Sequence, residues 1–171
     1  MKTIVFTDRA NPMPGKRIDE ISTLLHELLK RSEANDPDVA LNALLGAYVN
    51  LALKTNRLRG AAKAMQQASA IAQQVAKSSE AEASPGAQRD PIHAPELDAG
   101  FVDATNGLMD QVEMLFTGKP LDVVQTALLN LFMYVARHNP ACTAVSAQAA
   151  LRASQALTAT ATKAEPGATV H

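Results

Sequence analysis

The single cysteine, Cys142, is the residue in this 171-residue sequence that is best suited to nucleophilic chemistry. It falls in the first turn of a predicted helix, where the helix dipole lowers the pKa of a thiol, and His138 lies just before it. One hypothesis is therefore a reactive thiol at Cys142 assisted by His138. The other is a small side chain packed between helices. The sequence favours the second, because a nucleophile also needs a positioned base and an orienting group.

Basic side chains form a second candidate site, between Lys54 and Lys77. This stretch has five bases and no acid, and four of the bases crowd a predicted turn: Lys54, Arg57, Arg59 and Lys63. The stretch from 79 to 117 has eight acids and a single base, Arg89. Three interpretations stay open: contact with the phosphates of a nucleic acid, docking onto the acidic region within or between chains, and two solvated surfaces.

Motifs for metal or cofactor chemistry are missing from the sequence. None of the four histidines (His26, His93, His138 and His171) stands at a metal-ligand spacing from another histidine or a carboxylate. The sequence also lacks a glycine-rich phosphate loop, a Gly-x-Ser-x-Gly motif, a Cys-x-x-Cys pair and a His-Glu-x-x-His motif. We therefore expect no metal and no cofactor, and a non-enzymatic role is favoured.

Composition narrows the classes of protein further. The chain is 47% hydrophobic and 4% aromatic, with a formal net charge of -1. Abundant alanine and leucine with few aromatic residues favour helix over sheet. The near-zero net charge argues against a dedicated nucleic-acid binder. No apolar run approaches the roughly 20 residues of a membrane span, and the N-terminus has no signal-peptide pattern. The sequence thus predicts a soluble, cytoplasmic protein with no membrane partner.

Helical periodicity predicts the six elements that must position these residues. The first is expected to begin at residue 18 and to end before the Asn-Asp-Pro turn at 35–37. The other five are expected at 37–54, 58–77, 97–117, 120–137 and 140–157. Asp36 and Asn139 are expected to cap the helices that begin at Pro37 and Pro140. The helix at 37–54 is apolar almost all round, so we expect it to be central and buried.

A shift of 84 residues superposes the two halves of this pattern without a gap. It places Tyr48 on Phe132, and the Ala-Leu-Leu run at 43–45 on the same run at 127–129. The predicted fold class is therefore all-α: a six-helix bundle made of two tandem, duplicated three-helix units, with a short β-prone N-terminal arm. The predicted boundaries are an arm at 1–17, a first unit at 18–77, a flexible linker at 78–96, a second unit at 97–158 and a frayed tail at 159–171.

These features together favour a helical interaction or adaptor protein. The middle helices are more apolar than two neighbours can cover, and exposed apolar faces promote association. We therefore expect protein–protein contacts, above all the formation of a homodimer. Two alternatives stay open. One is a nucleic-acid-binding regulator that uses the basic segment Lys54–Lys77. The other is a small-molecule binder or enzyme with a pocket between the two units, near Cys142, Tyr48 and Tyr134.

Overall fold

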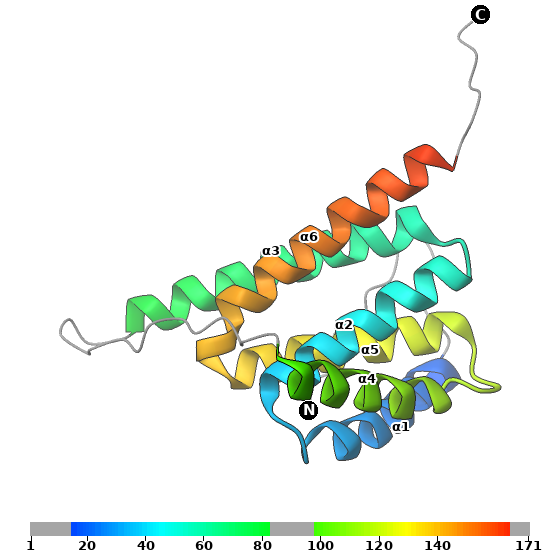
Figure 1. Cartoon of the computed structure of the whole chain (residues 1–171), viewed down its shortest axis with the longest axis horizontal. Helices are drawn as coiled ribbons and strands as arrows, with labels where there is room; N and C mark the ends of the chain where they lie inside the picture. Colours follow the sequence, from blue (N-terminus) through cyan, green and yellow to red (C-terminus); the bar gives the residue numbers. More distant parts are fainter. Residues whose placement is uncertain (1–14, 83–97, 165–171) are drawn as a thin grey trace, which may run out of the picture.

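The computed structural model describes residues 15–82 and 98–164, and every regular element in these two ranges is an α-helix. The six helices are α1 (Gly15–Ser32), α2 (Pro37–Lys54), α3 (Leu58–Glu82), α4 (Ala99–Met114), α5 (Leu121–His138) and α6 (Pro140–Lys163). They form three layers, with α3 on α6, α2 on α5 and α1 on α4 (Figure 1). Each layer therefore joins one helix from each half of the chain. The prediction of an all-α bundle of six helices is confirmed.

The helix ends follow the sequence signals with one exception. Asp36 caps α2 as predicted, because its side chain accepts a hydrogen bond of 2.9 Å from the backbone nitrogen of Asp38. The turn before α5 contains Gly118 at a φ of 71°, a conformation that glycine adopts without strain. Asn139 is the N-cap residue of α6 as predicted, but its side chain makes no capping hydrogen bond. Its Nδ2 donates to the carbonyl of Val135 at 2.7 Å, so it completes the end of α5 instead.

Several helices extend beyond the ranges that periodicity predicted. α3 ends at Glu82 rather than near Lys77, and α6 ends at Lys163 rather than near residue 157. α1 begins at Gly15, before its first apolar residue. Apolar periodicity reports the buried face of a helix, and a helix can continue past its last large apolar residue. The added part of α6 contains one further buried residue, Ala161. The predicted β-prone arm, most of the linker and the end of the tail lie outside the described residues.

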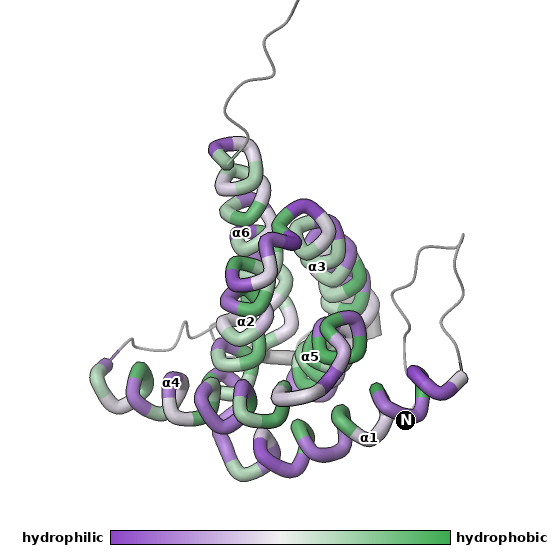
Figure 2. The backbone as a smooth tube through the Cα atoms, turned by 90° about the vertical axis from the view of Figure 1, so that its right-hand side faces the viewer, coloured by the Kyte–Doolittle hydropathy of each residue, from purple (hydrophilic) through white to green (hydrophobic). Residues whose placement is uncertain are grey.

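The helix α5 is the most deeply buried element. Twelve of its residues are buried: Val123, Val124, Thr126, Ala127, Leu128, Leu129, Asn130, Leu131, Phe132, Met133, Val135 and Ala136. The helices α1, α2, α3 and α6 all pack against it, and Figure 2 shows α5 enclosed between α1, α2 and α3. The sequence placed the helix at 37–54, α2, in the centre. That helix also packs against four others (α3, α4, α5 and α6), although Leu53 near its end is 48% exposed.

The long helices α3 and α6 make the most extensive contact in the bundle. Hydrogen bonds from two serines cross it: the Ser69 hydroxyl donates to the carbonyl of Ala147 at 2.7 Å, and the Ser154 hydroxyl donates to the carbonyl of Ala62 at 2.8 Å. A serine side chain is short, so it reaches the backbone of another helix only where small residues let the two helices approach closely. The alanine-rich faces of these helices predicted such an approach.

Burial repeats between the halves of the chain, but the offset changes along it. Buried Tyr48 in α2 matches buried Phe132 in α5 at the predicted 84 residues. In the third pair the matching offset is 85, because Ser69 and Ser154 make the equivalent hydrogen bonds. The alignment without a gap is therefore wrong beyond the turn between α2 and α3. The duplication itself stays a prediction.

Candidate functional site

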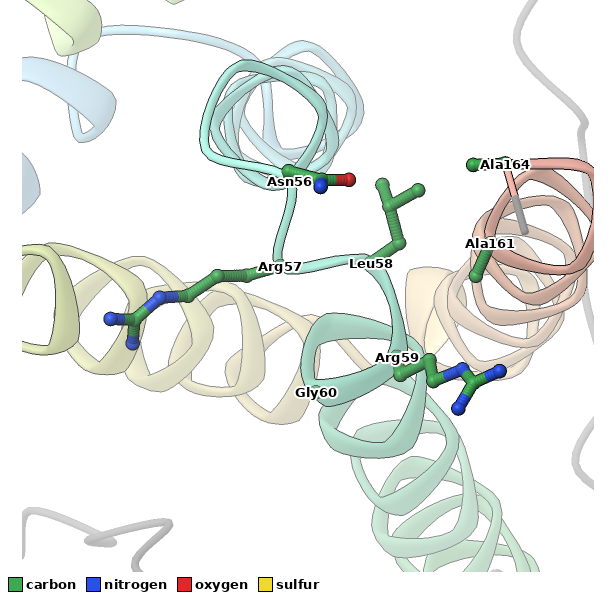
Figure 3. Close-up of a pocket in the computed structure, with 7 residues that line it drawn as sticks. All are labelled: Asn56, Arg57, Leu58, Arg59, Gly60, Ala161 and Ala164. Carbon is green, nitrogen blue, oxygen red and sulfur yellow. The ribbon is translucent and has the colours of Figure 1, made fainter. Parts of the chain in front are cut away.

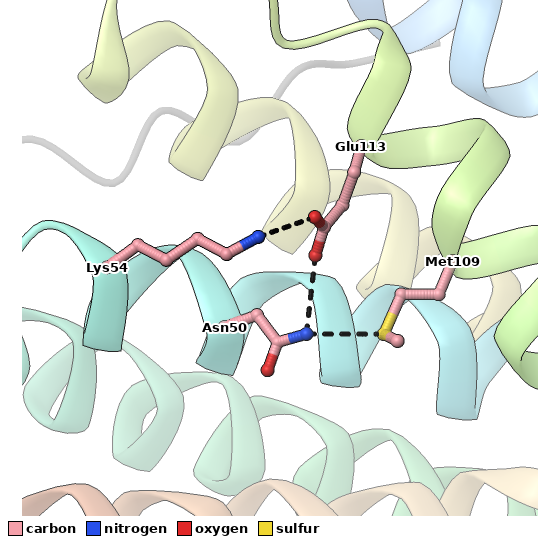
Figure 4. Close-up of polar contacts among 4 residues, drawn as sticks. All are labelled: Asn50, Lys54, Met109 and Glu113. Carbon is pink, nitrogen blue, oxygen red and sulfur yellow. Dashed lines mark hydrogen bonds and ion pairs between the residues drawn. The ribbon is translucent and has the colours of Figure 1, made fainter.

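Lys54, one of the four predicted basic site residues, pairs with the second half of the chain. Its Nζ lies 2.7 Å from Oε2 of Glu113 on α4 (Figure 4). The amide of Asn50 donates to Oε1 of Glu113 at 3.3 Å, and the same nitrogen lies 3.5 Å from the sulfur of Met109. The hydrogen bond from Lys54 lowers the pKa of Glu113 against the opposing effect of burial. At this pair, the basic stretch docks onto the acidic region within one chain.

The other three basic residues lie in the turn after α2 and along the start of α3. Arg57 and Arg59 line a cavity of about 400 Å³ between the start of α3 and the end of α6. Figure 3 shows their side chains extending to opposite sides of the start of α3. Lys63 is exposed one turn further along α3. Of the predicted site residues Lys54, Arg57, Arg59 and Lys63, the first pairs with Glu113, the next two extend to opposite sides (Figure 3), and the last follows Arg59 along α3.

Charge differs between particular helices instead. The charged side chains described in α3 and α6 are all basic: Arg59, Lys63, Lys77, Arg152 and Lys163. The charged side chains of α4 and of its capping residue are all acidic: Asp98, Asp103, Asp110 and Glu113. The α2–α5 layer lies between them (Figure 1). Among the described side chains, the bases of α3 and α6 thus lie on the opposite side of the α2–α5 layer from the acids of α4.

Cys142 is half-buried in the first turn of α6. Burial raises the pKa of its thiol to about 11, and the carboxylate of Asp38 adds to the shift. An activated thiol needs the opposite shift. Nδ1 of His138 lies 2.8 Å from the carbonyl oxygen of Tyr134, so this ring nitrogen is engaged by the backbone of its own helix. The structure gives the reactive-thiol hypothesis for Cys142 and His138 no support.

A second cavity, of about 230 Å³, lies between the two halves of the chain. Its walls come from the end of α1, the following turn and the start of α2 on one side, and from Tyr134, Val135, His138 and Asn139 on the other. Of the three residues that the sequence placed near such a pocket, Tyr134 lines it and Cys142 does not. Tyr48 is in the core at 3% exposure, where burial raises its pKa to about 12.

Leu53 and Met114 are candidate interaction residues that the sequence did not reveal. Leu53 is 48% exposed at the end of α2, and Met114 is 65% exposed at the end of α4. Each is the chain neighbour of one member of the Lys54–Glu113 ion pair. Whether these two side chains are exposed depends on where α4 crosses α2. The apolar pattern of a single helix does not predict that position.

Within residues 15–82 and 98–164, no group of three or more histidine, cysteine or acidic side chains is placed to hold a metal ion. None of the helices in the same ranges combines the length and the apolar character that crossing a membrane requires. No protein family, no curated protein and no solved structure matches this chain. Its function is therefore inferred from its residues and their geometry.

Proposed function

We propose that this chain is a non-enzymatic helical interaction protein that acts through protein–protein contacts and pairs with a second copy of itself. The observation that carries this proposal is the exposure of Leu53 and Met114 beside the Lys54–Glu113 ion pair. We call these four residues the α2–α4 edge. Large apolar side chains that gather on a surface and are flanked by polar groups mark sites of protein–protein interaction.

The chemistry of the α2–α4 edge supports a second copy as the partner. A two-fold interface uses the same surface on both subunits, so that surface must be complementary to itself. The edge carries two apolar side chains, one base and one acid. In a two-fold pair, apolar side chains meet apolar side chains, and Lys54 of one copy approaches Glu113 of the other.

Charged substitutions at the α2–α4 edge test this proposal. Leu53→Lys and Met114→Lys each place an unpaired ammonium group in the proposed interface, so we expect either to raise the dimer dissociation constant by about tenfold or more. Sedimentation equilibrium measures this constant. Val102→Lys is the matched control, because Val102 is 43% exposed near the other end of α4. Unchanged constants in both edge variants, or an equal loss in the control, would rule out this edge.

One observation favours the alternative function, a nucleic-acid-binding regulator. The α3–α6 layer carries only basic charges among its described side chains, including Lys63, Lys77 and Arg152. Phosphate contacts by such residues release counterions, so binding would weaken steeply as salt is added. Lys54 would contribute little, since it pairs with Glu113. The absence of any gel shift of duplex DNA or RNA at low salt would remove this alternative.

A further inference from the structure

The cavity between α1 and α5 lies where the other half of the chain has the Lys54–Glu113 ion pair between α2 and α4. The helix α1 packs on α5 as α4 packs on α2. The offset of 84 residues places His138 at the position of Lys54 and Leu29 at the position of Glu113. Leu29 has no carboxylate to pair with His138. The Lys54–Glu113 ion pair therefore fills this position in one half of the molecule. In the other half the Arg17–Asp122 ion pair joins the opposite end of α1 to α5, and a cavity of about 230 Å³ remains at this position.

The polar side chains around this cavity direct hydrogen-bond donors to main-chain carbonyls. Four such bonds are present: His138 Nδ1 to Tyr134 at 2.8 Å, Asn139 Nδ2 to Val135 at 2.7 Å, Asn35 Nδ2 to Arg31 at 2.9 Å and Ser32 Oγ to Leu29 at 3.0 Å. A carbonyl only accepts, so Nδ1 of His138 carries the hydrogen. The groups left for a ligand are mainly acceptors, which include the two amide oxygens.

The charge and the aromatic side chains of the cavity also favour a ligand that donates hydrogen bonds. Glu33 is the one carboxylate among the described residues that line it, and no lysine or arginine lines it. Tyr134 and His138 line one wall, and the centroids of their rings lie 4.1 Å apart. A carboxylate attracts a cation and accepts its hydrogen bonds, and the face of a tyrosine ring adds a favourable cation–π contact.

We propose that this cavity binds a cationic group, either an ammonium or a guanidinium, between Glu33, Tyr134 and His138. Its volume of about 230 Å³ suits a single basic side chain or a small free amine. It is below the range of roughly 300–1,000 Å³ that drug-sized ligands occupy. The inference does not depend on self-association, because the α2–α4 edge lies at the other contact.

Binding of small probes to the full-length protein tests the proposal. The probes are butylammonium, the neutral butanol of similar shape, and the tripeptides Gly-Lys-Gly and Gly-norleucine-Gly. The readout is the chemical shift of the His138 ring in NMR spectra. We expect the two ammonium probes to shift this signal with dissociation constants in the millimolar range, as suits ligands with few atoms, and the neutral probes to leave it unchanged.

Two substitutions locate the binding site. Glu33→Gln and Tyr134→Leu should each weaken butylammonium binding about threefold, since exposed ion pairs and exposed cation–π contacts are modest. Glu27→Gln is the matched control, because Glu27 is an exposed glutamate of α1 that does not line the cavity. It removes the same charge and should leave the affinity unchanged.

The two sources of a cationic group give different results. Tighter binding of Gly-Lys-Gly than of butylammonium indicates a basic side chain of a partner protein, and the reverse order indicates a free amine. Three results would overturn the proposal: butanol shifts the His138 signal as much as butylammonium does, Glu27→Gln weakens binding as much as Glu33→Gln does, or roughly tens of millimolar butylammonium leaves the signal unchanged. The comparison of charged with neutral probes uses the unsubstituted protein, so it holds even if a variant fails to fold.

Discussion

The environment of a side chain, more than its type, decides what the candidate residues of this protein can do. Cys142 has the sequence position of an activated thiol, but burial and Asp38 raise its pKa. Lys54 has the sequence position of a phosphate-binding residue, but Glu113 pairs with it. Asp38 and Glu113 both lie in the other half of the chain from the residue they affect. Residue types could be predicted from the sequence, whereas these long-range neighbours could not, because only the packing of the helices brings them close.

We expect Cys142 to react with a disulfide reagent at neutral pH at least about tenfold more slowly than a free model thiol, because little of it is thiolate. The rate should keep rising until the pH reaches about 11, the raised pKa of the folded thiol. A raised pKa means that the neutral thiol favours the folded state, so this contribution is lost as the pH rises through about 11. A rate at neutral pH equal to that of the model thiol would contradict the raised pKa.

Thr105 offers a test of burial at a single atom. Its hydroxyl is buried in α4 with no hydrogen-bond partner among the described residues. Thr105→Val replaces the hydroxyl with a methyl group of similar shape, so the free energy of unfolding should increase by about 1 kcal/mol. Urea denaturation measures the change. Thr105→Ser is the companion variant: it keeps the hydroxyl, loses the methyl group and should be less stable than the parent. A valine variant that is less stable than the parent would show that the hydroxyl is satisfied.

At the scale of helices, local signals predicted the elements but not their pairing. The number of helices, their order and the cap at Asp36 follow from periodicity and turn residues, which depend on neighbours in sequence. The pairing of α1 with α5 and the one-residue change of offset in α3 and α6 depend on contacts between halves. The greater burial of α5 compared with α2 has the same origin, since the two helices are similarly apolar.

The close contact of α3 with α6 predicts a strong effect of side-chain size. Ala147 is buried at this contact, where its carbonyl accepts the Ser69 hydroxyl. Ala147→Leu forces the two helices apart, so we expect a loss of about 1–3 kcal/mol in the free energy of unfolding, measured by thermal or urea denaturation. Ala70→Leu adds the same atoms at an exposed position of α3 and should change stability by less than about 0.5 kcal/mol. Equal effects of the two substitutions would contradict a close contact.

At the scale of the whole molecule, each layer joins one helix from each half of the chain, taken in the same order. The first helix of each half also packs against the middle helix of the other half. The helices α1 and α4 contact α5 and α2 of the opposite half, respectively. This arrangement agrees with the predicted duplication, which stays a prediction. The α2–α4 contact has the Lys54–Glu113 ion pair, with Leu53 and Met114 exposed beside it. The α1–α5 contact has the Arg17–Asp122 ion pair at one end of α1 and a cavity at the other. We infer that these two places are where the protein meets its partners.

The most direct test of the proposed function is the mass of the full-length protein in solution. Gel filtration coupled to light scattering should give a mass of twice the 18.1 kDa of one chain when the protein is at roughly tens of micromolar. The mass should fall towards that of one chain in the Leu53→Lys variant and stay unchanged in the Val102→Lys control. A mass of 18.1 kDa for the unsubstituted protein throughout this concentration range would contradict pairing through the α2–α4 edge.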